Sequence, residues 1–502
     1  MKDILIIGSG VAGLGFALEL SELRPDAKIL ILSKGHADAG STALAQGGMA
    51  VPVDEADMET HCSDTMRAGR GENDLETVRK FLKSLPHAIS KLELRGMKFD
   101  KLNGEYDRHH EGGHEIPRVL HCKDSTGKHL HQVLLNACHE KSNIRILEHQ
   151  MAYRVHRHHE TWRVKVIDLK EDVSRSYNAQ NLVLASGGIG ALFYNTTNDV
   201  LSTGDVLVMA MELGIQLKDM DSVQFHPTAL KIPHPIGRLP LLTEALRGKG
   251  ATLVNSEAQR FMYKYDERGE LSTRDIISKA IWDEMIKDEL NSVYLDARNI
   301  NDVAEHFPSV ESILNKYSFS LKKDLIPVIP AAHYLCGGIP ASIEGITGVQ
   351  NLYAIGECAC TGLHGRNRLA SNSLTEAFVM ALNAAQSLSK HIQIVNEVDE
   401  TDNHILPLSH PDEADLKKID TLRLLLSQQL YQMFSQDKVA KAPEFAFGSL
   451  SFDFVNNLLH EGYLSRAIVE LRNLILIGQQ IEKAFVEHDE NHGILSVSQS
   501  SE

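Results

Sequence analysis

The chain has 502 residues, a hydrophobic content of 43% and a formal net charge of −16. Its length predicts more than one domain, and its hydrophobic content is that of an ordinary globular protein. The excess of acidic residues argues against nucleic acid and against an anionic membrane surface as main partners. No apolar run approaches the roughly 20 residues that a membrane-spanning helix needs, so no membrane partner is expected.

The cysteines and the N-terminus indicate a cytoplasmic protein. The apolar run Ile4–Ile7 leads straight into glycines, which is not the pattern of a signal peptide. The cysteines show neither disulfide nor metal spacing, so we expect reduced thiols. They are Cys62, Cys122, Cys138, Cys336, Cys358 and Cys360.

The chain begins with the pattern of a βαβ unit. Ile4–Ile7 and Ile29–Leu32 are short, apolar and rich in β-branched residues, as buried parallel strands are. Val11–Leu23 between them has the apolar spacing of a helix. A parallel sheet with helical crossovers is therefore predicted.

A glycine turn joins the first strand to the helix. Gly8, Gly10 and Gly13 follow the GxGxxG pattern. Gly8 allows a tight turn, Gly10 lets the backbone approach a pyrophosphate, and Gly13 lets the helix pack on the strand. The turn predicts a dinucleotide site, but it does not by itself distinguish NAD from FAD.

Two later features favour a flavin. Ser33 and Lys34 stand after the second strand, where an NAD-binding unit usually has an acid for the ribose hydroxyls. Lys34 could contact the ribose or a phosphate, or lie solvated. Ser41–Gly48 (STALAQGG) combines small residues with one amide side chain. In an extended run, its backbone N–H groups could line the edge of an isoalloxazine ring.

Pieces of the same fold return further along the chain. Leu182–Ala185 and Leu352–Glu357 read as strands that run into glycine turns, and Glu357 could take over the ribose contact. Ser371–Ser373 is predicted to cap a helix over Leu374–Ala385. The positive end of that helix would stabilise the negative charge of a reduced flavin.

Arginine and histidine side chains in the second half suit a small dicarboxylate, because a guanidinium fork matches a carboxylate. For each of these residues a solvated or satisfied structural position is the alternative. The candidates are Arg247, Arg274, Arg366, Arg368, His226 and His333.

Other histidine-rich stretches raise the question of a metal. His109-His110 and His156–His159 lack carboxylates or cysteines at matching spacing, so no metal site is predicted. Glu111 lies in a glycine turn, Glu111–His114, where it could serve a substrate or simply shape a loop.

Together these segments resemble the superfamily of succinate dehydrogenase, fumarate reductase and L-aspartate oxidase. Within that superfamily, they are most similar to the L-aspartate oxidases. The likeness runs from Met1 to about Ala385. The motifs that carry it are GSGVAGL, STALAQGG, HEGGHE, RVLHCKDSTG, STGD, QFHPTAL, LLTEALRGKGA, RFM, DERGELSTRDI, PAAHYLCGG, YAIGE and TGLHGRNRLASNSL.

The resemblance implies a role for each matching residue. Arg274 would transfer protons with Glu244 in a relay, and Glu111 would face the substrate amino group. The substrate carboxylates would meet His226, Thr243, His333 and Arg368. With the glycine turn included, FAD would be held by Gly8, Ser9, Gly10, Val11, Ala12, Gly13, Lys34, Ser41, Thr42, Ala43, Leu44, Ala45, Gln46, Gly47, Gly48, Asp205, Glu357, Ser373 and Leu374.

Two positions separate the branches of the superfamily. Respiratory members attach FAD covalently to a histidine where this chain has Ser41, so non-covalent FAD is expected. They also lack the acid that L-aspartate oxidases carry in the EGGH turn, here Glu111. The chain departs from its family at Arg366, often Ala, at Lys249, often Glu, and after about Ile405, where the match is poor and the region looks shortened.

The predicted fold is α/β, with a Rossmann-like FAD-binding domain in residues 1–220 and 333–392 and an inserted α+β capping domain in residues 221–332. A helical domain is expected in residues 405–490, after a polar linker at Asn396–Asn403, and a disordered tail at Ser496–Glu502.

The predicted activity is the oxidation of L-aspartate to iminoaspartate. Reoxidation by O2, giving hydrogen peroxide, or by fumarate would follow, and the product would pass to quinolinate synthase on the route to NAD. A soluble fumarate reductase and an inactive flavin-binding protein are the alternatives.

Overall fold

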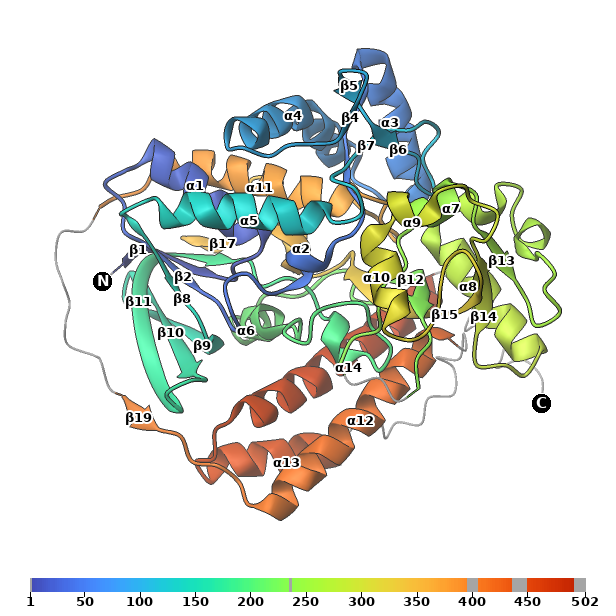
Figure 1. Ribbon diagram of the computed structural model, residues 1–502. Coiled ribbons are helices and arrows are strands. Elements are labelled where there is room, and N and C mark those ends of the chain that lie inside the picture. The colour runs from blue at the N-terminus through green and yellow to red at the C-terminus, as the bar shows by residue number, and fades with distance from the viewer. Residues whose placement is uncertain (1, 234–236, 395–404, 436–448, 492–502) are drawn as a thin grey trace.

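The computed structural model describes residues 2–233, 237–394, 405–435 and 449–491. The predicted linker at Asn396–Asn403 and the predicted tail lie outside these residues. Figure 1 shows a central sheet covered by helices, a second lobe beside it, and a group of helices formed by the C-terminal part of the chain. This arrangement confirms the predicted fold class.

The central sheet has the order β8-β2-β1-β11-β10-β9. It is parallel on one side, from β8 to β11, and antiparallel on the other, from β11 to β9. The predicted strands appear as β1 and β2, and α1 spans the predicted residues. The strands are β1 (Lys2–Ile7), β2 (Ile29–Leu32), β8 (Ile144–Leu147), β9 (Gln150–His158), β10 (Thr161–Asp168) and β11 (Val173–Leu184), with β17 (Leu352–Ala354) and β19 (Leu406–Pro407) paired to β11.

Three helices pack together over one face of this sheet (Figure 1). They are α1 (Val11–Leu23), α5 (Thr126–His139) and α11 (Asn372–Ser389). Every residue of α1 from Val11 to Ser21 is buried. A helix that is apolar on all sides needs cover on all sides, and the sheet, α5 and α11 supply it.

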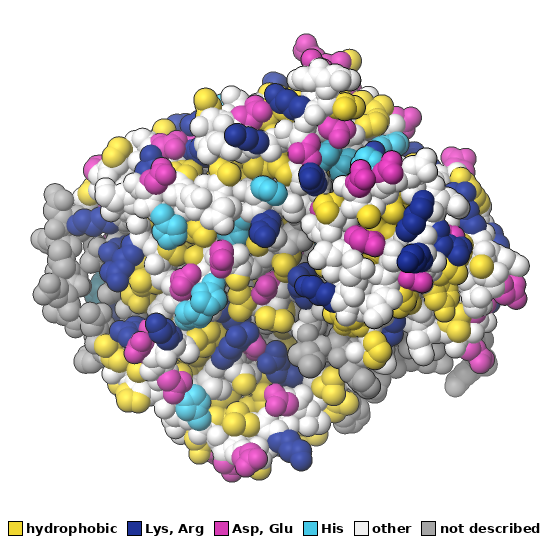
Figure 2. Space-filling view, viewed as in Figure 1, with side chains coloured by type: hydrophobic (Ala, Val, Ile, Leu, Met, Phe, Trp, Pro, Cys, Tyr) yellow, Lys and Arg dark blue, Asp and Glu magenta, His cyan; other side chains and the backbone are white. Residues whose placement is uncertain are grey.

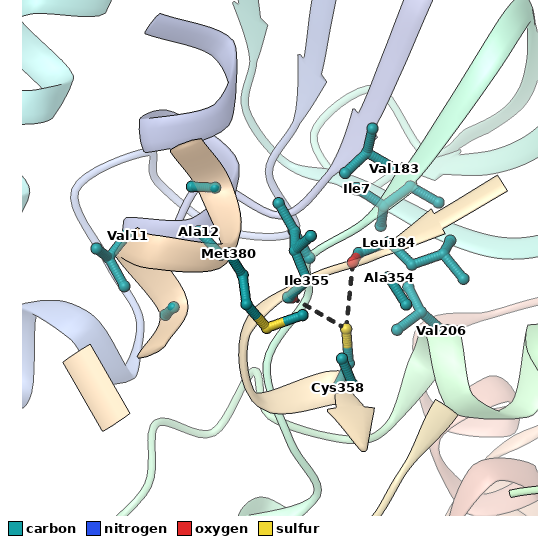
Figure 3. Packing of buried hydrophobic residues seen from close by; sticks show 14 of the residues in the cluster. Ile7, Val11, Ala12, Val183, Leu184, Val206, Ala354, Ile355, Cys358 and Met380 are labelled. Carbon is teal, nitrogen blue, oxygen red and sulfur yellow. Dashed lines mark hydrogen bonds between the residues drawn. The ribbon is translucent and has the colours of Figure 1, made fainter. Parts of the chain in front are cut away.

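The core continues under the glycine turns, where Figure 3 shows Ile7 and Leu184 near Ile355. The Cys358 thiol donates to the Leu184 carbonyl at 3.2 Å and lies 3.4 Å from the Ile355 carbonyl. All six cysteines are buried and unpaired, as expected for reduced thiols.

The second lobe has its own sheet and its own buried cluster, which includes Leu246, Phe261 and Ile281. Strand β15 runs across the predicted boundary at residue 332, and the domain boundaries remain predictions. The elements are β12 (Val223–Leu230), α7 (Ala245–Gly248), β13 (Thr252–Val254), η2 (Met262–Lys264), η3 (Gly269–Leu271), α8 (Arg274–Lys287), β14 (Val293–Asp296), α9 (Val303–His306), α10 (Pro308–Asn315) and β15 (Leu325–Leu335).

Further elements complete this part of the chain. These are α2 (Ser41–Leu44), β3 (Met49–Ala50), α3 (Glu55–Ala68), α4 (Leu75–Leu94), β4 (Lys101–Leu102), β5 (Glu105–Tyr106), β6 (Arg108–His109), β7 (Val119–Leu120), η1 (Gly190–Leu192), α6 (Asp205–Glu212), β16 (Ile339–Pro340), η4 (Gly356–Cys358) and β18 (Ala359–Cys360).

The C-terminal part folds into α12 (Glu413–Ser435), α13 (Ser449–His460) and α14 (Arg466–Asn491), as the predicted helical domain requires. Helix α14 packs on α12, α13 and α6. It docks through polar contacts: the Asn473 amide donates to Asp205 at 2.8 Å, and Arg472 pairs with Glu212.

The surface carries both signs of charge. Figure 2 shows basic and acidic side chains interspersed on one face. Within the described part of the chain, no helix has the length and hydropathy needed to cross a membrane.

Candidate active site

A large cavity opens at the carboxyl ends of the parallel strands, where open α/β sheets bind ligands. It encloses about 1370 Å³ of empty space, its open mouth included. Of the residues predicted to hold FAD, its lining contains Gly8, Ser9, Gly10, Val11, Ala12, Lys34, Ser41, Thr42, Leu44, Ala45, Asp205, Glu357, Ser373 and Leu374.

The remaining predicted cofactor residues do not line this cavity. They are Gly13, Ala43, Gln46, Gly47 and Gly48. Two of these glycines serve close packing. A Cβ at Gly13 would lie 2.1 Å from the Gly8 carbonyl oxygen, and one at Gly48 would lie 2.1 Å from that of Leu120.

The glycine turn is tight, as predicted. Gly8 has a φ of +119°, and a Cβ there would lie 2.2 Å from the Ala185 carbonyl oxygen. The N-cap residue of α1 is Gly10, which has no side chain to cap the helix. The Val11 N–H donates to Thr42 Oγ1 at 3.1 Å. This helix N-terminus suits an anion.

The segment Ser41–Gly48 differs from the extended run that the sequence predicts. Its first four residues form the helical turn α2, and the backbone becomes extended at Ala45, where the turn ends. The turn places Thr42 against the start of α1, which an extended chain would pass by. Propensity over so short a stretch yields to this tertiary contact.

The N-terminus of α11 also differs from its prediction. Its N-cap residue Ser371 has a φ of +60° and makes no side-chain cap. The Ser371 hydroxyl instead donates to Glu111 Oε2 at 2.6 Å and accepts from the Gly48 N–H at 3.3 Å. The start of α11, with Ser373 and Leu374 in the cavity wall, is thus open to a ligand.

Lys34 and Asp205 are held by each other. The Lys34 ammonium lies 3.0 Å from Asp205 and 2.9 Å from Glu470 of α14, and it donates to Thr203 Oγ1 at 2.6 Å. Helix α14 therefore supports the cofactor-side wall of the cavity through its contacts with Lys34 and Asp205. Glu357, also in this wall, is partly exposed, and its partial burial raises its pKa to about 7.

These features fit FAD. Two helix N-termini without side-chain caps border one cavity, and small residues make up much of its wall. Other lining residues were not assigned to the cofactor from the sequence, although many follow the ends of strands, which is the signal that could have found them. They include Ser33, Ala39, Gly40, Gln150, Ala185, Ser186, Gly187, Thr197, Asn198, Ser202, Ile355 and Gly356.

The cavity extends to His333 and Arg368, two of the predicted substrate residues. Arg368 is 2% exposed, its guanidinium carbon lies 4.4 Å from the centre of the Tyr334 ring, and its Nε has no hydrogen-bond partner. Among the described residues, no carboxylate lies within ion-pair distance of the Arg368 guanidinium. Burial first and Arg274 second lower the pKa of Arg368 to about 10. A buried cation of this kind is stabilised by an anionic ligand.

Arg274 belongs to a buried charge network. Its Nε donates to Glu244 Oε2 at 2.7 Å, and Arg247 forms an ion pair with Glu244 Oε1 at 3.1 Å. Burial acts to raise the pKa of Glu244, but the two guanidinium groups outweigh it, so the pKa lies below its ordinary value. Glu244 is therefore ionised and positions Arg274.

Gln224 joins the two arginines, Arg274 and Arg368, and was not among the residues predicted from the sequence. Its Oε1 accepts from Arg274 Nη1 at 2.9 Å and from Arg368 Nη2 at 3.0 Å. Gln224 lies two residues before His226 in β12, and residues at this spacing share one face of a strand. That spacing was the available signal.

Glu111 is buried close to this network. Its Oε2 accepts from Ser371, while its Oε1 has no hydrogen-bond partner. Burial first and the nearby Glu244 second raise the pKa of Glu111 to about 7. A cationic ligand beside this carboxyl group would stabilise its ionised form.

The two predicted histidines lie together, with ring centres 5.1 Å apart. Burial first, and then Arg274, hold both their pKa values well below 6.5, so both rings are neutral hydrogen-bonding groups. His333 is the extra residue of a β-bulge between β12 and β15, and bulges often redirect a side chain. Thr243 is buried, and it directly precedes Glu244 in the sequence.

The other two candidate arginines are already paired. Arg247 donates to the Glu270 carbonyl at 2.7 Å besides its pairing with Glu244. Arg366 binds Asp221 at 2.9 Å and is not among the residues that line the cavity. Arg366 therefore does not fill the substrate end.

The fold and cavity define a flavoprotein. The FAD binding domain family matches residues 3–374, and the cofactor is FAD. Among solved structures, a quinol–fumarate reductase with menaquinol molecules superposes with a TM-score of 0.80 at 26% identity, covering 96% of this chain and 89% of that one.

Similar sequences show which family of flavoproteins the chain belongs to. The L-aspartate oxidase of Yersinia pestis is 36% identical over 522 residues, covering 98% of this chain and 95% of the relative. That of Neisseria meningitidis is 39% identical over 392 residues, covering 77% and 78%. The chain belongs to the L-aspartate oxidase family of FAD-dependent oxidoreductases.

Proposed function

We propose that this chain oxidises L-aspartate to iminoaspartate. The observation that carries the proposal is Glu111, a buried carboxylate with one oxygen lacking a partner, beside a network that contains the buried cations Arg274 and Arg368. L-Aspartate has two carboxylates and one ammonium group. Arginines complement the carboxylates, and Glu111 complements the ammonium group.

The clamp in this proposal consists of Arg368, His226, His333 and Thr243. Arg368 supplies a guanidinium fork for one carboxylate, and the neutral imidazoles and the hydroxyl donate hydrogen bonds. His226 comes from β12, His333 from β15, and Thr243 and Arg368 from loops, so the four groups hold the substrate at several points. Such positioning accounts for a large part of catalysis in reactions of this kind.

Arg274 is proposed to transfer the proton, with Glu244 as its relay. Glu244 Oε2 accepts from Arg274 Nε at 2.7 Å, so the guanidinium is oriented by a fixed carboxylate. Oxidation removes a hydride from C2 of aspartate and a proton from its ammonium group. FAD, when bound, supplies the hydride acceptor and returns the electrons to O2, giving hydrogen peroxide, or to fumarate.

The FAD is proposed to be bound without a covalent link. Ser41 stands where respiratory members of the superfamily have the attaching histidine, and its hydroxyl lies 3.3 Å from Ser202 Oγ and from the Asn198 amide. Acid denaturation followed by ultrafiltration should release all the yellow colour into the filtrate. Colour retained with the protein contradicts the proposal.

The experiment that tests the activity is anaerobic bleaching of the bound flavin. L-Aspartate should bleach it within the time of mixing, whereas succinate at the same concentration should not. Bleaching by succinate alone would favour a soluble fumarate reductase, to which the 26% identity with a quinol–fumarate reductase gives some support. Bleaching by neither would indicate an inactive flavin-binding protein.

Two further parts of the proposal concern the cell. Six buried, unpaired cysteines support a reducing compartment such as the cytoplasm. Iminoaspartate hydrolyses readily in water, so its transfer to quinolinate synthase, on the route to NAD, would be favoured by direct hand-off.

A further inference from the structure

We propose that His36, Glu148 and His149 form a Zn²⁺ site that ties together two loops of the cofactor cavity wall. The sequence predicts no metal site, because its histidine-rich stretches lack further ligands at local spacing. The residues of this group come from two distant segments, which only the fold brings together. One ligand atom from each lies within 4.8 Å of the other two.

The two segments meet because their strands are neighbours. β2 and β8 pair in parallel, with Leu32 opposite Leu147, so the loops that follow start side by side. Backbone hydrogen bonds join them, from the His149 N–H to the Gly35 carbonyl at 3.1 Å and from the Gln150 N–H to the Ser33 carbonyl at 2.8 Å. The ligands therefore project from a defined backbone.

The side chains are close to a metal-binding geometry. His36 Nδ1 lies 3.6 Å from Glu148 Oε2, and the rings of His36 and His149 are 4.5 Å apart, edge to face. Glu148 Oε1 accepts from the Ala37 N–H at 2.7 Å, which fixes the carboxylate and leaves Oε2 for a metal. Ligands at about 2.0–2.2 Å from one Zn²⁺ are separated by distances of this order, so small side-chain rotations suffice.

The chemistry of the group selects the metal. Two imidazoles and one carboxylate are a ligand set for Zn²⁺, with water in the fourth position, and not for Mg²⁺, which prefers oxygen ligands. His36 and Glu148 are exposed, so a metal can reach them. The alternative is that no metal binds here and that His36 and Glu148 form only an ion pair with each other.

The consequence concerns the cofactor. Ser33, Lys34, Ala39 and Gly40 of the first loop line the cavity, and so does Gln150 beside His149. A metal that bridges the loops would hold this stretch of wall together and slow the opening that releases FAD. This step rests on FAD binding in the cavity and is independent of the proposed substrate.

The test measures zinc binding to the holoenzyme, without an affinity tag, by equilibrium dialysis and calorimetry. The wild type should bind one more Zn²⁺ than His149→Asn or Glu148→Gln, and Mg²⁺ should not compete. Asn tolerates the left-handed backbone of residue 149, whose φ is +58°, and Gln keeps an acceptor for Ala37. His87→Asn, which removes an exposed histidine from α4, is the matched control and should bind as much as the wild type.

The second readout is FAD release, followed by the rise in flavin fluorescence after dilution. Zn²⁺ should slow release from the wild type and from His87→Asn at least about 5-fold, the lower range of coupling between two sites. It should leave release from His149→Asn unchanged. Equal zinc stoichiometry in all variants, or equal release rates with and without Zn²⁺ in the wild type, would overturn the proposal.

Discussion

The cofactor cavity and the substrate end beside it use different parts of the chain. Around the glycine turn the wall consists largely of backbone and small side chains, and a single Cβ at Gly8 would collide with backbone. At the proposed substrate end the proposed recognition groups are long charged side chains: Arg274 and Arg368, which Gln224 joins, and Glu111, which accepts from Ser371. The first region depends on backbone geometry, the second on compensation of buried charge.

This difference predicts which property each substitution changes. A change at the substrate end should alter chemistry or affinity while FAD stays bound. A change in the glycine turn should alter FAD binding and stability together. The following experiments test that division, from the largest expected effect on turnover to the smallest.

Arg274→Leu should lower kcat by roughly 100-fold or more, the contribution of a positioned proton-transfer group. FAD content per protein should stay at the wild-type level, because Arg274 is not among the residues that line the cofactor cavity. Steady-state kinetics and the flavin absorbance measure the two quantities.

Arg70→Leu is the matched control for Arg274→Leu. Arg70 is an exposed arginine that pairs with Asp275, next to Arg274 in the chain, at 2.8 Å. Its kcat should remain near the wild-type value. Comparable losses in the two variants would show that a general change of charge, not proton transfer, causes the effect.

Gly8→Ala should lower FAD occupancy after purification at least about 10-fold, because even 1.4 kcal/mol corresponds to one decade in affinity. The left-handed backbone alone costs about 1–2 kcal/mol for a non-glycine residue, and the Cβ would also lie 2.2 Å from the Ala185 carbonyl oxygen. FAD content and Tm should fall together.

Gly214→Ala provides the comparison for Gly8→Ala. Gly214 also has a positive φ, +82°, but nothing lies within 4 Å of its added Cβ. Its Tm should fall modestly and FAD content should not change. A normal FAD content in Gly8→Ala would contradict the importance assigned to close backbone packing.

Glu111→Gln should raise KM for L-aspartate roughly 10-fold, since a charge-assisted hydrogen bond to ammonium contributes about 1.5–3 kcal/mol. Fumarate reduction by prereduced enzyme should stay nearly unchanged, because fumarate has no ammonium group. Glu115→Gln, an exposed acid in the same loop, is the control. Equal losses for both substrates, with a lowered Tm, would mean that Glu111 only shapes the turn.

The pH profile sharpens the same prediction. The pKa of Glu111 is raised to about 7, so the group is neutral below that pH and cannot attract an ammonium group. We expect kcat/KM for L-aspartate to fall as pH drops through about 7 in the wild type and to be flatter in Glu111→Gln. Folding raises the pKa of Glu111 from 4.5 to about 7, so the wild type loses stability as pH rises across that range. The Tm of Glu111→Gln should therefore rise relative to the wild-type Tm between about pH 4.5 and 7, and the difference should level off above pH 7.

Arg366→Ala should have the smallest effect on turnover. Its KM for L-aspartate should stay within about 2-fold of the wild-type value, as for residues away from a binding site. Its Tm should nevertheless fall, because Asp221, which is 6% exposed, loses its partner. A large change in KM would place Arg366 in the pocket after all.

The sequence by itself determined the parts of this protein that depend on local pattern. The glycine turn, β1, α1 and β2 follow from apolar spacing and from the glycines that permit close backbone approach. Arg368, Glu111 and His333 could be selected as candidates because their residue types suit a charged substrate and their motifs resemble a family.

Only the tertiary structure decided which side chains meet. Gln224 bridges Arg274 and Arg368, Ser371 binds Glu111 instead of capping α11, and Glu148 reaches His36 across neighbouring strands. These contacts join residues far apart in the chain. Their geometry depends on strand order, a β-bulge and left-handed loop residues, because a shift of one residue in register turns a side chain to the opposite face. Local propensity carries no information about that register.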